Sequence, residues 1–250
     1  MWRALAVWIA CTGVVGVAGT ARGAPGKDVR VETAHGPLHV WKPKGYQPRT
    51  AGIVVYVHGF YTDVDGAMTN HKLATQFAAS RRNALFIVPE APSGPDDKPS
   101  WTNLEELLAA ASKAIAEPLP EGPLVVAGHS AAHLTIVKWV DDPRVTHIIL
   151  IDALYAGLLE FLTWLDAMPG NELHSMVIIA SGTVKQAEPF FKAVPYAVKR
   201  NGLPAAVHDF TRRERTAKVL YVRSRVGHMD LVTRGKTLPV LLQRTRLKGL

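Results

Sequence analysis

The sequence predicts an α/β fold with a mostly parallel central sheet of about eight strands and helices on both faces. One observation is size, because 250 residues with 48% hydrophobic content can bury a large core in one domain. The other is order, since apolar runs of strand length alternate along the chain with segments of helical periodicity. Strands that alternate with helices form a parallel sheet covered on both sides. We therefore expect a single domain over residues 25–250.

Residues 1–24 have the features of a secretory signal peptide. A basic start, Met1-Trp2-Arg3, precedes an apolar run from Ala4 to Gly19, and the small residues Ala21, Gly23 and Ala24 then offer cleavage sites. The run is shorter than the roughly 18–20 residues that span a bilayer. We expect cleavage and export to the periplasm or the medium; if the segment is not cleaved, it would anchor the protein in a membrane. Cys11, the single cysteine, lies in this segment, so we expect no disulfide in the mature chain.

The mature chain begins with two alternating stretches that predict an N-terminal hairpin. They are residues 28–34 and 37–41, joined by the turn residues His35-Gly36. Residues 51–57 form a continuous apolar run, which is typical of an interior parallel strand. From there helices and strands are expected to alternate: helix 67–81, strand 84–88, helix 104–116, strand 124–127, helix 131–140, strand 145–151, helix 157–168, strand 176–180, helix 184–200 interrupted at Pro189 and Pro195, strand 218–223 and helix 231–247 with Pro239 inside it.

Residue types that carry chemistry follow four of the predicted strands. Because the carboxyl ends of parallel strands share one edge of a sheet, these residues are expected to lie together. They are His58-Gly59-Phe60, Gly128-His129-Ser130-Ala131-Ala132, Asp152 and Gly227-His228. A serine hydroxyl becomes a nucleophile when an imidazole takes its proton, and a carboxylate holds that imidazole in the required tautomer. We predict that Ser130 is the nucleophile and His228 the base.

These motifs resemble those of the α/β-hydrolase superfamily, from about Val29 to the C-terminus. That family has a Gly-x-Ser-x-Gly nucleophile elbow and a triad in the order serine, acid, histidine. Ala132 replaces the last glycine here, which is a sterically mild departure. His58-Gly59 is similar to the oxyanion loop of the family, and Gly227-His228 is similar to its histidine loop. The resemblance implies a serine hydrolase with a small cap or none, cleaving a carboxylic ester or related acyl bond through an acyl-enzyme, and the N-terminal signal implies that this hydrolase is exported.

A tetrahedral intermediate also needs two preorganised donors for its oxyanion. We assign this role to the backbone N–H groups of Phe60 and Ala131. The other histidines near the motifs have structural interpretations: His58 braces the oxyanion loop, and His129 and His133 fill positions beside the serine.

The acid of the triad has two candidates. Members of the family usually place it after the strand that corresponds to residues 176–180, where the first carboxylate of this chain is Glu188. Asp152 instead ends the apolar strand 145–151, where a charge is costly unless it is paired. Some family members place the acid at that point. We favour Asp152 and keep Glu188 as the alternative.

The sequence also bears on cofactors and on the substrate pocket. The ten histidines show no HExxH or comparable spacing, and there is no phosphate-binding loop or dinucleotide fingerprint, so we expect no metal and no cofactor. The apolar segment 153–170 either lines a pocket for an acyl chain or packs as an ordinary covering helix. Together with the loop 91–102 it leaves a fairly open cleft, suited to varied or bulky substrates.

The charge of the chain is uneven. The net charge is +8, and from Pro189 to the end there are 14 Lys or Arg against 3 Asp or Glu. A basic surface attracts anionic lipid or polymer, so peripheral contact with anionic envelope components is one expectation, whereas no nucleic-acid module is present. Two alternatives to an esterase acting on a small or acyl-bearing substrate stay open: an amidase, peptidase or acyltransferase of envelope material, and a non-catalytic protein that binds an anionic polymer or membrane.

Overall fold

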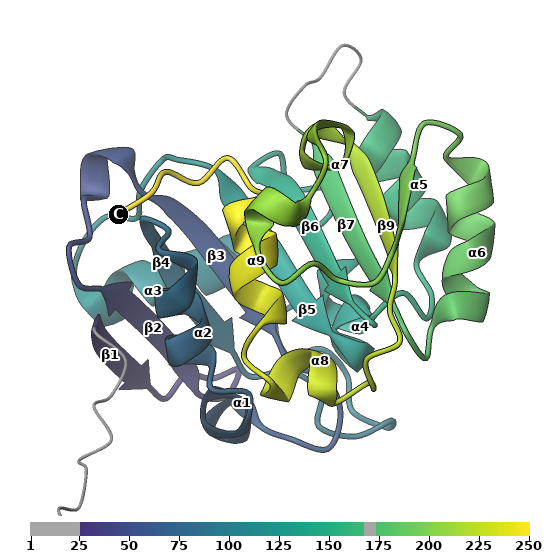
Figure 1. Ribbon diagram of the computed structural model, residues 1–250. Helices are drawn as coiled ribbons and strands as arrows, with labels where there is room; N and C mark the ends of the chain where they lie inside the picture. Colours follow the sequence, from purple (N-terminus) through teal and green to yellow (C-terminus); the bar gives the residue numbers. More distant parts are fainter. Residues whose placement is uncertain (1–25, 168–173) are drawn as a thin grey trace, which may run out of the picture.

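One sheet organises the parts of the chain that this computed structural model describes, residues 26–167 and 174–250. Nine strands make it up within those residues: β1 Gly26–Val31, β2 Leu38–Pro43, β3 Gly52–Val57, β4 Ala84–Pro89, β5 Leu124–His129, β6 Val145–Ile151, β7 Ser175–Ala180, β8 Val198–Asn201 and β9 Val219–Arg223. Their order is β1-β2-β4-β3-β5-β6-β7-β9-β8 (Figure 1). The β1–β2 and β2–β4 pairs are antiparallel, and all other pairs are parallel. The predicted signal segment 1–24, with Cys11, lies outside the described residues.

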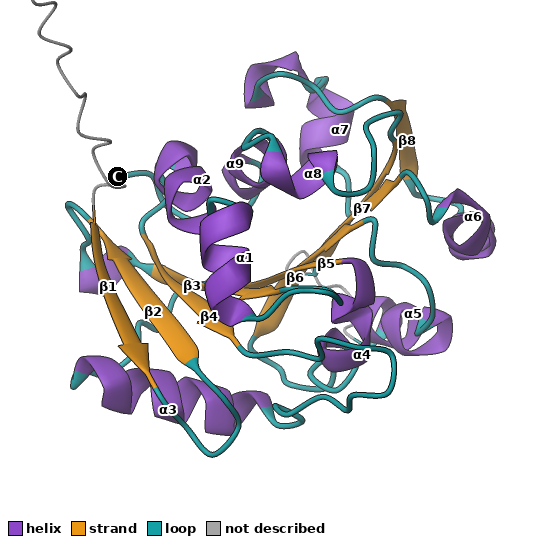
Figure 2. Ribbon diagram, turned by 90° about the horizontal axis from the view of Figure 1, so that it is seen from below, coloured by secondary structure: helices purple, strands orange, loops and turns teal. Residues whose placement is uncertain are grey.

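Helices cover both faces of this sheet, as the alternating pattern predicts. They are α1 Val64–Asn70, α2 Leu73–Ser80, α3 Leu104–Ile115, α4 His133–Ile136, α5 Leu158–Asp166, α6 Val184–Ala193, α7 Arg212–Thr216, α8 Asp230–Thr233 and α9 Thr237–Gln243. Figure 2 shows α3, α4 and α5 on one face and α1, α2, α8 and α9 on the other. Within the described residues, no helix is both long and apolar enough to cross a membrane.

The alternation of side chains along the strands produces two cores. In β3, Ile53 and Val55 face the core that contains Phe161 of α5, whereas Val54 faces the core that contains Phe77 of α2. All six residues of β3 are buried, which explains why this strand is a continuous apolar run. Each fully buried aliphatic side chain contributes about 1.5–3 kcal/mol to folding.

The N-terminal hairpin and most predicted strands are confirmed, but the prediction of one helix over 184–200 is wrong. Helix α6 ends at Ala193, two residues before Pro195, whose ring disfavours helical geometry in the residue before it. Val198–Asn201 then form β8, an edge strand that pairs in parallel with β9. The strand is short and alternates between half-buried and exposed residues, so its pattern is too weak to outweigh the helical one.

Three other predicted helices are shorter or broken. Residues 67–81 are divided between α1 and α2, because Lys72 adopts a left-handed conformation with a φ of +52°. Residues 131–140 contain only the four-residue α4. Residues 231–247 are divided between α8 and α9 at Gly235, whose φ of +75° suits a glycine. The breaks do not change the order of the strands, so the carboxyl ends of β3, β5 and β6 still meet at one edge of the sheet.

Candidate active site

Ser130 lies at a sharp turn between β5 and the short helical segment Ser130–Ala132 that precedes α4. Its φ is +56°, a conformation that costs a non-glycine residue about 1–3 kcal/mol and persists only when its surroundings impose it. The packing shows why the neighbours are small. A Cβ added to Gly128 would lie 2.5 Å from the Cβ of Ala132 and 2.6 Å from the Cδ1 of Ile136. The small residues around the serine therefore allow the strand to turn directly into a helix, as the motif predicts.

The loop after β3 packs directly against this turn. A Cβ added to Gly59 would lie 2.6 Å from the Cβ of Ser130 and 3.2 Å from the backbone N of Ala131. Among the described residues, no hydrogen bond uses the backbone N–H of Phe60. Ala131 is in the first turn of a helical segment, where N–H groups lack intrahelical acceptors. Both predicted oxyanion donors thus belong to segments that meet at Ser130.

His58, which pairs with Glu90, holds this loop in place through a hydrogen bond to its backbone. His58 is 1% exposed, and its Nδ1 donates to the carbonyl of Gly59 at 2.8 Å, while its Nε2 lies 2.9 Å from Glu90 Oε1. In a trans peptide the C=O and N–H point in opposite directions, so this bond turns the N–H of Phe60 away from His58. Burial raises the pKa of Glu90, but the bond with His58 and backbone N–H donors outweigh it and hold the pKa below its usual value.

The imidazole of His228 pairs with Asp152. The distance from His228 Nδ1 to Asp152 Oδ2 is 2.7 Å. Asp152 is fully buried at the end of β6 and also accepts hydrogen bonds from the backbone N–H groups of Ser181, Gly182 and Thr183 and from the Thr183 hydroxyl. Burial raises the pKa of Asp152, but the bonds from His228 and from the loop after β7 outweigh it and hold the pKa well below its usual value. Asp152 is therefore a carboxylate.

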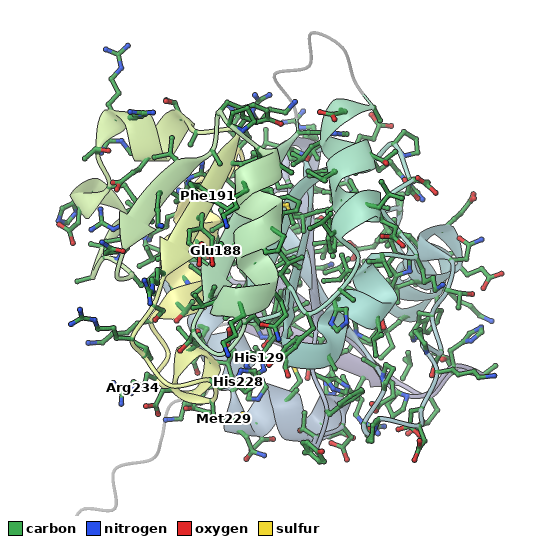
Figure 3. All side chains as sticks on the ribbon, turned by 90° about the vertical axis from the view of Figure 1, so that its right-hand side faces the viewer. His129, Glu188, Phe191, His228, Met229 and Arg234 are labelled. Atoms are coloured by element: carbon green, nitrogen blue, oxygen red, sulfur yellow. The ribbon has the colours of Figure 1, made fainter. Side chains whose placement is uncertain are left out.

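Glu188, the alternative acid, is not brought to the site. It lies on α6, where its side chain is 59% exposed and pairs with Lys192 at 3.7 Å. Figure 3 shows Glu188 well apart from His228, which lies next to His129. The loop after β7, where the family usually places its acid, contributes N–H donors to Asp152 instead of a carboxylate. Of the two predicted candidates, the structure pairs Asp152 with His228.

The buried imidazoles of His129 and His71 lie in a row with that of His228. The rings of His129 and His228 are 4.4 Å apart, and those of His71 and His129 are 5.8 Å apart. His129 Nε2 donates to the backbone carbonyl of His228 at 3.2 Å. Burial, followed by the charges of His228 and His71, lowers the pKa of His129 to about 3. His129 is thus a neutral support for the loop that carries His228, a role that its place in the motif does not reveal. His133, the other histidine beside the serine, is buried and contacts the backbone carbonyl of Ser130 at 3.3 Å through its Nδ1.

Buried histidines make stability depend on pH. Burial is the main cause that lowers the pKa of His71 and of His147 to about 4 and that of His129 to about 3, against about 6.5 in an unfolded chain. Between these values the unfolded state binds the protons and the native state does not. The free energy of unfolding is therefore expected to fall as the pH drops from about 6.5 to about 4, by up to about 1.4 kcal/mol per pH unit for each histidine.

Urea unfolding at pH 7.5, 6.0 and 5.0 measures this slope. The variant His71→Gln should have a shallower slope than the parent protein. His208→Gln is the matched control, because the His208 side chain is 83% exposed and its replacement should leave the slope unchanged. A free energy of unfolding that does not vary between pH 7 and 5 would contradict the prediction.

Aromatic and apolar side chains lie on the loops around the site; the sequence indicated Tyr155, within the apolar segment 153–170, but not Tyr61 or Met229. Tyr61 is 89% exposed, Met229 52% and Tyr155 42%. They follow Phe60, His228 and Asp152 closely along the chain, on loops at the same edge of the sheet. Burial and the charge of Asp152 raise the pKa of Tyr155, and the ring of Tyr155 lies 5.8 Å from that of His133, three residues after the serine. The side chain of His228 is 34% exposed, so the site is open to solvent.

The described residues include no group of three or more His, Cys, Asp or Glu side chains arranged to hold a metal ion. The arrangement is that of an acid, an imidazole and a serine at a strained turn. Such a set can transfer a proton and form a covalent acyl intermediate.

Comparison with known proteins supports the fold. No family model matches the chain, and no curated protein matches it in sequence. A ferulic acid esterase matches with a TM-score of 0.56 at 9% sequence identity, over 87% of this chain and 98% of its own. An S-formylglutathione hydrolase from Agrobacterium tumefaciens matches with a TM-score of 0.56 at 12% identity, over 92% and 98%. A thermostable carboxylesterase cloned from a metagenomic library matches with a TM-score of 0.55 at 13% identity, over 90% of each chain. The chain has the fold of the α/β-hydrolase superfamily.

Proposed function

We propose that the protein is a serine hydrolase that cleaves a carboxylic ester or a related acyl bond. The observation that carries this proposal is the 2.7 Å bond between His228 Nδ1 and the buried carboxylate of Asp152, on the same sheet edge as Ser130 with its φ of +56°. In the neutral imidazole, an ionised, buried acid that accepts the Nδ1 proton selects the tautomer whose Nε2 has a free lone pair. Nε2 is then the general base for the serine hydroxyl.

The reaction proceeds in two halves. The hydroxyl oxygen of Ser130 attacks the acyl carbon while His228 takes the hydroxyl proton. Asp152 stabilises the resulting imidazolium. The imidazolium then protonates the leaving alcohol, which departs and leaves an acyl-serine. Water enters, gives its proton to His228 and attacks the acyl carbon, and the acid product leaves as Ser130 recovers its proton. In both halves the N–H groups of Phe60 and Ala131 stabilise the oxyanion.

The surroundings of the site favour a substrate with a bulky or apolar acyl group. Tyr61, Tyr155 and Met229 offer exposed apolar surface next to the proposed triad. An ester is the bond we favour, because the similar structures include a ferulic acid esterase, an S-formylglutathione hydrolase and a carboxylesterase.

Active-site labelling combined with a substrate panel tests the proposal. A fluorophosphonate should modify the protein once, on the tryptic peptide of residues 114–138, whose only serine is Ser130. Short acyl and hydroxycinnamoyl esters should be hydrolysed faster than the matching amides and peptides. Labelling without ester turnover would favour an amidase, peptidase or acyltransferase, and no labelling at all would favour a non-catalytic protein.

The contact between Gly59 and the serine turn gives a prediction about rate. Replacing Gly59 with alanine places a Cβ 2.6 Å from the Cβ of Ser130 and displaces the loop that carries the N–H of Phe60. Loss of one oxyanion donor should lower kcat by about 10²–10³-fold. Steady-state kinetics on a soluble ester measure the loss. Gly249→Ala is the matched control, because its Cβ would meet its nearest atom at 3.9 Å; equal rates in the two variants would contradict the assignment.

A further inference from the structure

A second concave site lies at the opposite edge of the sheet, where β6, β7 and β9 begin. It is a cavity of about 450 Å³ lined by His147, His174, Ser175, Arg215, Thr216, Ala217, Lys218, Arg244 and Arg246. Helix α7 borders it at the amino-terminal ends of these strands (Figure 1). β6 runs from Val145 at this edge to Ile151 beside Asp152, so a strand of about 20 Å separates the cavity from the proposed triad. The cavity takes no direct part in the chemistry at Ser130.

The wall of this cavity carries four cations and no carboxylate. Arg215, Lys218, Arg244 and Arg246 form no ion pair with any carboxylate of the described residues. The neighbouring Glu214 is occupied elsewhere, since it pairs with Arg200 at 2.8 Å. Cations gathered in a concave site without a counter-charge create a strongly positive local potential.

Backbone carbonyls hold three of these cations in place. Arg244 Nε donates to the carbonyl of Glu214 at 2.9 Å, and a second nitrogen donates to the carbonyl of Ala217. Lys218 Nζ donates to the carbonyl of Leu165 at 2.9 Å, and Arg215 donates to that of Phe210. A guanidinium has five N–H donors and an ammonium three, so each group keeps donors for a ligand. Burial lowers the pKa of Arg244 to about 10, which leaves it charged at neutral pH.

An unpartnered imidazole adds an independent indication of a ligand. His174 is 5% exposed, stacks on Trp164 at 4.3 Å and donates from Nδ1 to the carbonyl of Trp164 at 2.9 Å. Its buried Nε2 has no hydrogen-bond partner among the protein atoms described. A buried polar atom without a partner costs about 1–3 kcal/mol. A hydroxyl of a bound acid, or a proton taken up together with an anion, would satisfy it.

We propose that this cavity binds a phosphate group carried on a larger molecule. A single carboxylate would neutralise one of four cations, whereas a phosphate has a charge near −2 and several oxygens that match the fork of an arginine. The volume of about 450 Å³ also leaves room for the organic group to which the phosphate is attached. The four cations of the cavity all belong to the basic segment that runs from Pro189 to the end of the chain. The proposed phosphate binding does not depend on the proposed hydrolytic function.

Calorimetric titration with glycerol phosphate tests the site at an ionic strength of about 0.15 M, where exposed charges are screened over about 8 Å. The parent protein should show saturable binding at one site. Arg215→Gln combined with Arg246→Gln should weaken it at least about tenfold, because two charge-assisted contacts are lost. Arg212→Gln combined with Arg213→Gln is the matched control: both residues are exposed on α7, the change in charge is the same, and neither lines the cavity. This control should change affinity less than about twofold, the spread expected of screened surface charges.

Two further measurements sharpen the result. The imidazole resonances of His147 and His174 should shift on titration, whereas that of the exposed His208 should not. Vesicles that contain phosphatidylglycerol, compared with phosphatidylcholine alone, distinguish a lipid phosphate from a soluble one; binding to either source that requires Arg215 and Arg246 supports the proposal. Equal weakening in the two double variants, or no saturable binding to glycerol phosphate or to vesicles, would overturn it.

Discussion

Replacing Ser130 with alanine is expected to lower kcat by about 10⁶-fold and to abolish labelling by a fluorophosphonate. The loss is this large because the hydroxyl is the proposed nucleophile, and alanine has no oxygen that could form the acyl-enzyme. The residual rate would come from the oxyanion donors and from substrate binding alone. Steady-state kinetics with a soluble ester, together with labelling and mass spectrometry, measure both effects.

The fold should survive this change. Alanine keeps the Cβ that packs against Gly59, and the left-handed backbone is as strained for alanine as for serine. A thermal melt should therefore match that of the parent protein. Ser112→Ala on α3 serves as the control, since the Ser112 hydroxyl bonds only locally to the carbonyl of Glu117. Undiminished labelling of Ser130→Ala would refute the nucleophile assignment.

Replacing Asp152 with asparagine should lower kcat by about 10⁴-fold while leaving KM nearly unchanged. An amide in this place can donate to His228 Nδ1, which favours the tautomer with its proton on Nε2, the wrong one for a base. The amide also offers no negative charge to an imidazolium. Initial rates over a range of concentrations of a soluble ester measure kcat and KM separately for the parent protein and the variant.

Glu188→Gln is the matched control for the acid. Glu188 is exposed on α6 and contacts Lys192, so its replacement should change kcat less than about twofold, as expected for an exposed ion pair. If Glu188→Gln lost activity and Asp152→Asn kept it, the acid would have to be reassigned. Asp152→Asn also weakens the bonds from the loop 181–183, so rates should be measured well below its melting temperature.

Much of the fold was predictable because strands of a covered parallel sheet are apolar along their whole length. Residues 51–57 and 145–151 match β3 and β6 closely for this reason. Strand β8 escaped prediction because an edge strand of four residues buries little, and because its lysine and arginine, Lys199 and Arg200, are adjacent and break the apolar alternation of a strand. The break between α1 and α2 occurs at Lys72, which is neither glycine nor proline, so the sequence does not indicate it.

At the candidate site, the sequence by itself determined which residues reach the edge: Ser130 among small residues, His228 after a late strand, and Gly59 in the loop opposite. These are local patterns, since a turn of small residues follows from nearby side chains alone. The tertiary structure decided the rest. It decided between the two predicted acids by pairing His228 with Asp152, not Glu188, across 76 residues of chain. It also paired Glu90 with His58 across 32 residues and His129 with the backbone of His228 across 99. Such contacts depend on strand order and register, which bring together residues whose spacing along the chain carries no trace of their proximity.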